Sequence, residues 1–209
     1  MITHPARVDD YPRNGHAMIS SPPQLLFILF ASIVFMHFMT FGAKTFVIIP
    51  HLDSGAGYGQ ASFMSGTIVT LYEGTTQRID LYRGVAAALL FVCSVMLYEW
   101  ARRSVRGRGF SVGLSGRVPD SVFQGGPYAY VRHPFYLSYM LAFAGSALAL
   151  PQIPMLVVCV ANLALFTYMV ISDERTIEGS PLASDYATYK QRVGRFFPRF
   201  LVGRPNASG

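Results

Sequence analysis

The sequence predicts an all-α, multi-pass transmembrane protein with about four spans, and two observations carry this prediction. Of the 209 residues, 52% are hydrophobic and only 13% are charged, whereas an average soluble domain carries about 25% charged residues. Two long stretches, residues 14–43 and 135–172, contain no Asp, Glu, Lys or Arg at all. A soluble surface needs charged side chains throughout, so we expect this chain to lie in lipid.

Two single spans are predicted in the amino-terminal half. A helix needs about 20 apolar residues to cross a hydrocarbon core of about 30 Å, and residues 23–41 and 81–101 both have this length and character. The first run also resembles the core of a signal peptide, but it is long and no small-residue cleavage site follows it.

The apolar run from Phe135 to Ser172 is too long for one span. Pro151 and Pro154 interrupt it, and proline breaks or ends a helix, so the run predicts a transmembrane helical hairpin. Residues 55–72 are also uncharged, but they are rich in Gly, Ser and Thr. They remain open as a fifth span.

The basic residues predict the orientation. Six arginines (102, 103, 106, 108, 117 and 132) lie before the hairpin against the single acid Asp120, and six more basic residues follow it. Because such segments stay preferentially in the cytosol, we expect both on that side. Residues 1–22 then form a cytosolic arm, residues 23–101 hold the first helices and an outward-facing loop, and residues 102–209 carry the chemistry. Topology accounts for the net charge of +6, and no nucleic-acid motif is present.

The first candidate motif, Val131 to Tyr136, opens the hairpin. Pro134 suits the first turn of a helix, where its missing N–H costs nothing, so Arg132 and His133 stand at a helix start. Unpaired N–H groups and a partial positive charge at such a position attract a carboxylate.

The second candidate motif is the acidic pair Asp173 and Glu174, where the hairpin returns to the same side. Two carboxylates at a membrane boundary can simply end a span. Here the hairpin brings them back toward Arg132 and His133, and ionisable residues at membrane depth are candidates for function.

A third pattern follows in the tail, where Tyr186, Tyr189 and Val193 have the three-and-four spacing of one helix face. This spacing predicts an amphipathic helix, which commonly lies on lipid headgroups.

As an ordered set, these segments resemble the isoprenylcysteine carboxyl methyltransferase family and related bacterial phospholipid-methyltransferase-like membrane enzymes. The resemblance covers about residues 115–200. It implies an S-adenosylmethionine-dependent methyltransferase in a bacterial inner membrane, with its site facing the cytosol. Carried over residue by residue, the cofactor-binding positions are Tyr128, Val131, Arg132, His133, Pro134, Tyr136, Glu174, Tyr186 and Tyr189. This chain departs from the family pattern at Ser138, at Asp173, and at Leu182–Ala183, where it has about one extra residue.

The residues agree with what that cofactor demands, namely an acid, a basic partner and aromatic faces for its cation. We expect Arg132 to bind the carboxylate, Glu174 the ammonium or ribose, and the tyrosines the sulfonium or adenine. Glu174 and Arg195 are the candidate catalytic residues. Arg195 either orients an anionic acceptor or pairs with a headgroup phosphate, and His133 is either a ligand or a hydrogen-bond partner of the tail.

The remaining polar residues in the spans have structural explanations. His37 and Asn162 are expected to form hydrogen bonds between helices. No set of His, Cys, Asp or Glu has metal-ligand spacing, so we expect no metal.

Several alternatives stay open. The tail is also similar to that of membrane reductases of the steroid 5-alpha-reductase type, which use NADPH, although the acidic pair favours the methyltransferase. A non-enzymatic membrane adaptor is the third hypothesis. The acceptor could be an isoprenylcysteine carboxylate, a phospholipid amine, or a small thiol or carboxylate, and the oligomeric state is undetermined.

Overall fold

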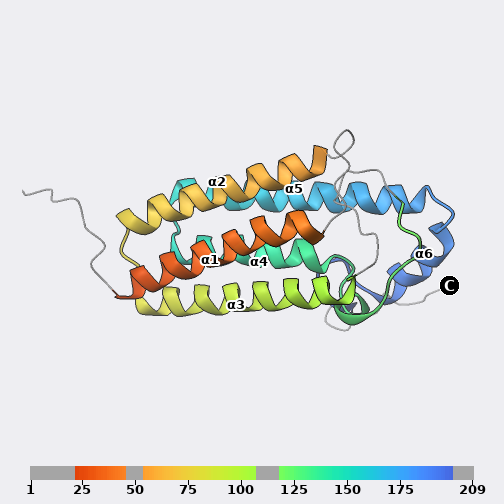
Figure 1. Ribbon diagram of the computed structural model, residues 1–209, viewed down its shortest axis with the longest axis horizontal. Helices are drawn as coiled ribbons and strands as arrows, with labels where there is room; N and C mark the ends of the chain where they lie inside the picture. Colours follow the sequence, from red (N-terminus) through yellow and green to blue (C-terminus); the bar gives the residue numbers. More distant parts are fainter. Residues whose placement is uncertain (1–21, 46–53, 107–117, 200–209) are drawn as a thin grey trace, which may run out of the picture.

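The computed structural model describes residues 22–45, 54–106 and 118–199, and these ranges are helical apart from turns and one isolated backbone bridge. Five long helices run side by side along one axis (Figure 1): α1 (Pro22–Thr45), α2 (Ser54–Thr76), α3 (Leu81–Ser104), α4 (Pro134–Ala149) and α5 (Ile153–Glu178). The short helices η2 (Gly126–Ala129) and α6 (Ala183–Arg192) lie at one end of this bundle. The predicted all-α class is confirmed.

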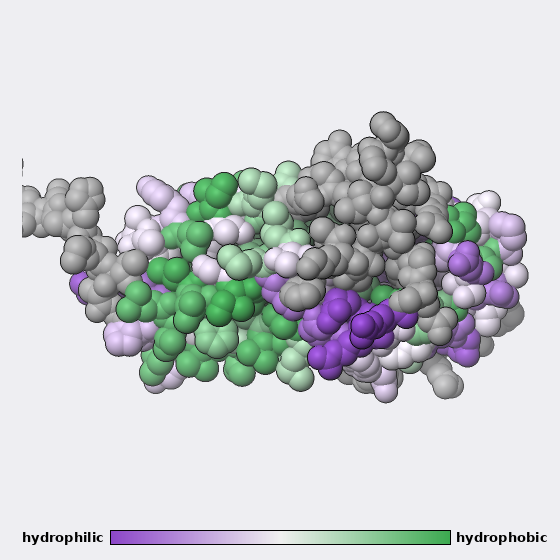
Figure 2. Space-filling model, in the orientation of Figure 1, coloured by the Kyte–Doolittle hydropathy of each residue, from purple (hydrophilic) through white to green (hydrophobic). Residues whose placement is uncertain are grey.

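Within the described residues, three helices are long and apolar enough to cross a membrane, namely α1 (over Pro22–Thr40), α3 and α5. Hydrophobic side chains cover the body of the bundle in Figure 2. The chain is therefore a membrane protein. Helix α4 has 16 residues and is about 24 Å long, which is shorter than a hydrocarbon core of about 30 Å.

The predicted hairpin is confirmed as α4 and α5, which are separated only at residues 150–152. Pro151 lies in that turn, whereas Pro154 lies in the first turn of α5, where proline is tolerated. The hairpin returns the chain to the end from which it started (Figure 1). Both basic segments are thus joined to the same end of the bundle.

Helix α2 covers the weakly apolar segment that the sequence left open as a fifth span. It runs the length of the bundle against α1 and α5. A Cβ at Gly66 would overlap the ring of Phe143, and one at Gly74 would lie 3.0 Å from Ile28. Glycine has a low intrinsic helix propensity, so packing against neighbouring helices at these close approaches has to stabilise α2.

Because all five helices run alternately up and down, α1 begins at the end opposite η2 and α6 (Figure 1). The predicted amino-terminal arm, residues 1–22, lies outside the described residues except for Pro22. The side of the membrane on which it lies stays a prediction.

Hydrogen bonds and ion pairs between helices confirm the expectations for the lone polar residues. Asn162 on α5 accepts a hydrogen bond from Ser62 on α2, and His37 on α1 lies 3.0 Å from Glu99 on α3. Ser94 of α3 donates to the carbonyl oxygen of Ser138 at 2.6 Å, so Ser138 lies at a close contact between α3 and α4.

Aromatic rings fill the bundle interior. The ring of Tyr139 on α4 lies 4.8 Å from Phe63, 5.1 Å from Phe38 and 5.6 Å from Phe166, on α2, α1 and α5 respectively. These contacts tie the first turns of α4 to three other helices and so fix the residues just before it.

Candidate functional site

The tail after α6 crosses the start of α4 and binds it through the backbone. The N–H of Arg132 donates to the carbonyl oxygen of Gly194 at 2.9 Å, and the N–H of His133 donates to that of Arg195 at 3.3 Å. Val131 and Gly194 form a short parallel bridge. We call residues 193–198 the strap, because they cover the segment that precedes α4.

The backbone requires glycine at two positions around the site. Gly126 in η2 has a φ of 57°, a left-handed conformation that favours glycine, and a Cβ there would overlap Ser104. At Gly194 a Cβ would clash with the carbonyl oxygen of Phe197. Gly194 was not among the predicted site residues, since a lone glycine in a tail carries no signal by itself.

The centre of the site is Glu174, near the carboxyl end of α5, with a residue exposure of 3%. Its Oε1 accepts a hydrogen bond from Arg132 Nε at 3.1 Å, forms an ion pair with Arg132 Nη2 at 2.9 Å, and lies 3.1 Å from His133 Nε2. Its Oε2 accepts from Arg195 Nη2 at 2.6 Å. The structure therefore brings together four predicted residues from three separate segments, here called the Glu174 cluster (Arg132, His133, Glu174 and Arg195).

Arg132 also holds the strap. Its Nη1 donates to the carbonyl oxygen of Val193 at 2.8 Å, and its side chain is only 6% exposed, against 38% for Arg195. A buried pair of this kind contributes little net stability, but losing one partner costs much because an unpaired charge stays buried. The side chains of the Glu174 cluster thus hold the strap against the hairpin.

His133 fills the structural role that the sequence suggested for it, as a hydrogen-bond partner of the tail. Its backbone bonds the tail and its ring contacts Glu174. Whether it also contacts a ligand stays a prediction.

A second polar contact lies beside the Glu174 cluster. The hydroxyl of Tyr136 on α4 donates to Asp173 Oδ2 at 3.1 Å. Asp173, which departs from the family pattern, is therefore long enough to form a hydrogen bond with Tyr136. The ring of Tyr136 lies 6.0 Å from the His133 ring and 6.4 Å from the Tyr139 ring. Tyr136 thus links the polar site to the aromatic interior.

The α6 tyrosines face the site and are buried, so this helix face packs on the protein and does not lie on lipid headgroups. Tyr189 donates its hydroxyl to the carbonyl oxygen of Tyr128 at 2.6 Å. The hydroxyl of Tyr186 is buried without a hydrogen-bond partner. Burial, together with the nearby Glu174 carboxylate, raises the pKa of Tyr186 far above its usual range, so this phenol stays protonated.

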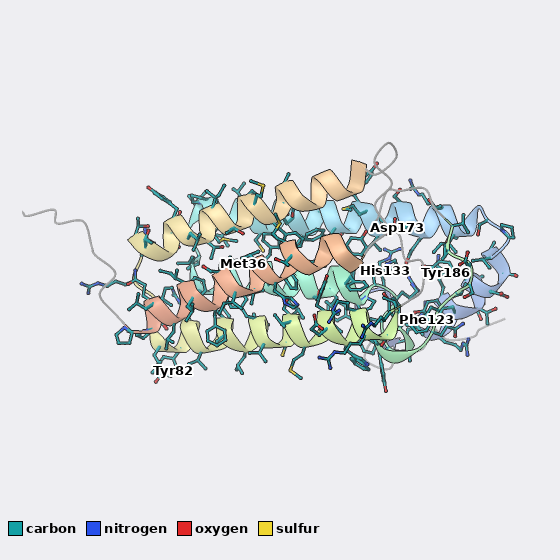
Figure 3. All side chains as sticks on the ribbon, in the orientation of Figure 1. Met36, Tyr82, Phe123, His133, Asp173 and Tyr186 are labelled. Atoms are coloured by element: carbon teal, nitrogen blue, oxygen red, sulfur yellow. The ribbon has the colours of Figure 1, made fainter. Side chains whose placement is uncertain are left out.

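A turn at residues 179–182 joins α5 to α6, in the segment where the resemblance implies one extra residue. There the N–H of Gly179 donates to Arg175, that of Ser180 to Ile177 and that of Ala183 to Ser180. Figure 3 shows His133, Asp173 and Tyr186 gathered at one end of the bundle, and Tyr82 at the other.

The other predicted positions contribute surface and backbone. Tyr128, Val131 and Pro134 are buried at the site, and burial raises the pKa of the Tyr128 hydroxyl well above its usual value. Within the described ranges, no group of three or more His, Cys, Asp or Glu side chains is placed to hold a metal ion.

Two comparisons with known proteins cover this part of the chain. A sequence model of the phospholipid methyltransferase family matches residues 82–187, which is half of the chain. The cobalt-zinc-cadmium resistance protein CzcN of Cupriavidus metallidurans is 30% identical over 91 residues, which cover 44% of this chain and 42% of that protein. The family match runs from α3 to α6 and includes Arg132, His133, Glu174 and Tyr186.

Proposed function

Because the chain belongs to the phospholipid methyltransferase family, we propose that it transfers the methyl group of S-adenosylmethionine to a lipophilic or membrane-partitioned acceptor at the Glu174 cluster. The observation that carries the proposal is the convergence of two guanidinium groups, an imidazole and a carboxylate on the segment that opens α4. Membership in the family supports methyl transfer, and the geometry supports the location.

The residues present fit this cofactor. Tyr186 offers a buried hydroxyl that has no partner among the described residues, and a ligand oxygen or nitrogen would satisfy it. Arg195 and Arg132 offer guanidinium groups for a carboxylate. The rings of Tyr136, Tyr186 and Tyr189 offer faces for a sulfonium or an adenine. Tyr128, Val131, His133 and Pro134 would complete the surroundings.

S-adenosylmethionine, when bound, supplies a methyl group that is already activated. The protein then has to hold that methyl in line with the acceptor atom and exclude water, which can supply about 7 to 11 kcal/mol. The strap and α6 provide the cover. Glu174, which faces three donors, is suited to hold Arg132 and Arg195 in place, and Asp173 beside Tyr136 is the carboxylate better placed to accept a proton.

The acceptor's chemistry decides whether that proton transfer is needed. A carboxylate acceptor needs no deprotonation, whereas a thiol or an amine must lose a proton. The candidates remain an isoprenylcysteine-like carboxylate, a phospholipid amine, and a small thiol or carboxylate.

We place the site on the cytosolic face of a bacterial inner membrane, because the arginine-rich segment 102–132 and the basic tail join the same end of the bundle and basic residues favour the cytosol. Since α4 is short, its polar start would lie close to the headgroup region. A lipophilic acceptor could then reach the site from the bilayer.

The relative CzcN is named for resistance to cobalt, zinc and cadmium, but this activity is not carried over. The match covers less than half of that protein, so a function named for the whole relative does not transfer from it.

Binding calorimetry on the purified protein in detergent tests the proposal. S-adenosylmethionine should bind and NADPH should not, whereas the opposite result would favour a reductase. Arg195→Gln should weaken S-adenosylmethionine binding by about ten- to a hundredfold, the usual effect of losing a charge-assisted hydrogen bond. Arg192→Gln, which removes a tail arginine that bonds Gln124 at 3.0 Å, is the matched control and should leave the affinity unchanged.

A further inference from the structure

Two hydrogen bonds set the register between α2 and α5. Ser62 donates to Asn162 Oδ1, and Thr70 Oγ1 donates to Met155 Sδ at 3.6 Å. The two helices run in opposite directions (Figure 1), so eight residues forward along α2 correspond to seven residues back along α5. Both contacts therefore belong to one pair of facing helix surfaces.

The next turn of this interface brings Glu73 level with Gln152. Glu73 follows Thr70 by three residues and Gln152 precedes Met155 by three, and residues three apart share a helix face. This pair lies at the end of the bundle opposite the Glu174 cluster (Figure 1). Unlike the two inner pairs, it lacks a donor. Glu73 is 5% exposed and its carboxylate has no hydrogen bond or ion pair with any described residue, and Gln152 Oε1 is buried without a partner there.

A third oxygen without a partner comes from α4. Phe143 of α4 packs against Gly66 of α2, where a Cβ would overlap its ring. Both helices run toward the same end of the bundle (Figure 1), so Ser146 lies one turn nearer to Glu73. Ser146 is fully buried, and its hydroxyl has no hydrogen-bond partner among the described residues. We call Glu73, Ser146 and Gln152 the Glu73 cluster.

The chemistry of the Glu73 cluster selects a cation. Buried polar groups in proteins nearly always have a partner, and a buried charge without one is costly. Carboxylate, amide and hydroxyl oxygens are the ligands that hard cations prefer. The one carboxylate of the set balances one positive charge, so the set fits a monovalent ion.

Exposed tyrosines place the Glu73 cluster near the membrane surface. Tyr72, beside Glu73, and Tyr82, at the start of α3, are both exposed, and Figure 3 shows Tyr82 at this end of the bundle. Tyrosine is enriched where the hydrocarbon core meets the headgroups. An ion can therefore reach the cluster from water without crossing the hydrocarbon core.

We propose that the Glu73 cluster binds a monovalent metal cation, with sodium as the probe, and that this ion joins α2, α4 and α5. Glu73 supplies the charge, and Gln152 and Ser146 supply neutral oxygen ligands. Metal-ligand spacing in the sequence does not reveal this site, because two of the three ligands are an amide and a hydroxyl and not His, Cys or acidic residues. The inference does not depend on the proposed function.

Thermal unfolding of the full-length protein in detergent, with sodium chloride replacing choline chloride at constant ionic strength, tests the site. The Tm should rise saturably, by about 5 to 10 °C at a hundredfold excess of sodium over its Kd. Glu73→Gln should abolish this rise. The matched control, Asp80→Asn, removes a half-exposed acid that pairs with Arg83 at the same end, and it should keep the full rise.

Three results would overturn the proposal. Equal losses in Glu73→Gln and Asp80→Asn would mean diffuse attraction of sodium to this end. No sodium effect in the unmodified protein would mean that the Gln152 amide nitrogen, or a proton on Glu73, satisfies the cluster. A larger rise with magnesium at equal concentration would exclude a monovalent site.

Gln152→Leu separates ion binding from general stability. Losing one neutral ligand should raise the sodium concentration needed for half of the Tm rise by about tenfold. A purely structural Gln152 would lower the Tm equally in sodium and in choline, and this result would remove it from the site and overturn the proposal. Circular dichroism checks that each variant is folded, and if Glu73→Gln fails to fold, Gln152→Leu decides by itself.

Discussion

Replacing Glu174 with glutamine is expected to release the strap from the start of α4. Glutamine keeps the shape of the side chain but removes the charge that faces Arg132, His133 and Arg195. Arg132 would then stay buried without a counter-charge, and breaking a buried pair in this way costs about 3 to 5 kcal/mol. The loss falls on the contact between the strap and the hairpin, because the ion-pair partners of this charge lie on the segment before α4 and on the strap.

Hydrogen exchange measures that local loss. The backbone N–H groups of Arg132 and His133 are protected by the carbonyl oxygens of Gly194 and Arg195. A loss of about 3 kcal/mol should speed their exchange by about two orders of magnitude. Exchange in the peptide covering α3 should not change. S-adenosylmethionine affinity should fall together with strap protection.

The double variant Arg132→Gln with Glu174→Gln shows whether charge is the cause. Removing both partners leaves no unpaired buried charge, so part of the strap protection should return. S-adenosylmethionine binding should not return. Unchanged exchange and unchanged affinity in Glu174→Gln would refute the reasoning and reduce the acidic pair to a helix end.

Three further outcomes are expected. Gly194→Ala should open the strap and weaken S-adenosylmethionine binding about tenfold or more while bundle stability stays the same, which affinity and thermal unfolding measurements together can check. The raised pKa of Tyr186 means that the folded tail holds this proton more tightly than the unfolded tail does, so the contribution of Tyr186 to tail stability should be constant below pH 10 and fall above it as the unfolded state deprotonates first. Tyr186→Phe should reduce this loss, as followed by exchange against pH. If α2 crosses the membrane, cysteines placed at Ser20 and Ser121 in a background without native cysteines should label from opposite sides, whereas four spans would put both on one side.

The sequence was sufficient to predict that the segment before α4 and the acidic pair of α5 meet. Two prolines near residue 151 divide a long apolar run, and this division alone brings the Arg132 and Glu174 segments to one end of the bundle. The spacing of Tyr186 and Tyr189 likewise predicted their shared helix face. Both inferences rest on local rules, namely span length and helical period, which do not require knowledge of distant contacts.

The sequence was not sufficient where distant contacts decide the outcome. Glycine and serine in α2 lower its hydropathy, and contacts with other helices, such as those of Gly66 with Phe143 and of Gly74 with Ile28, explain why it packs as a full-length helix. The α6 tyrosines are a second case in which the sequence was not sufficient. Their spacing identifies a helix face but not the surface against which that face packs. The bridge between Val131 and Gly194 joins segments more than sixty residues apart, and no periodicity reports such a register.

Arg132 and Arg195 differ in burial, and this difference favours Arg195 over Arg132 as the partner of the cofactor carboxylate. The sequence assigned the cofactor carboxylate to Arg132, but this side chain is almost fully buried and already bonds Glu174 and Val193. Arg195 is more exposed and meets Glu174 from the strap side, so it can turn part of its guanidinium edge toward a ligand at lower cost. We therefore expect Arg195→Gln to lower S-adenosylmethionine affinity while the Arg132 N–H stays protected from exchange. Arg132→Gln should lower both affinity and the protection of the neighbouring His133 N–H, because it also removes the anchor of the strap. Equal loss of protection in the two variants would mean that both arginines act mainly as structural clamps, and the carboxylate partner would have to be sought elsewhere.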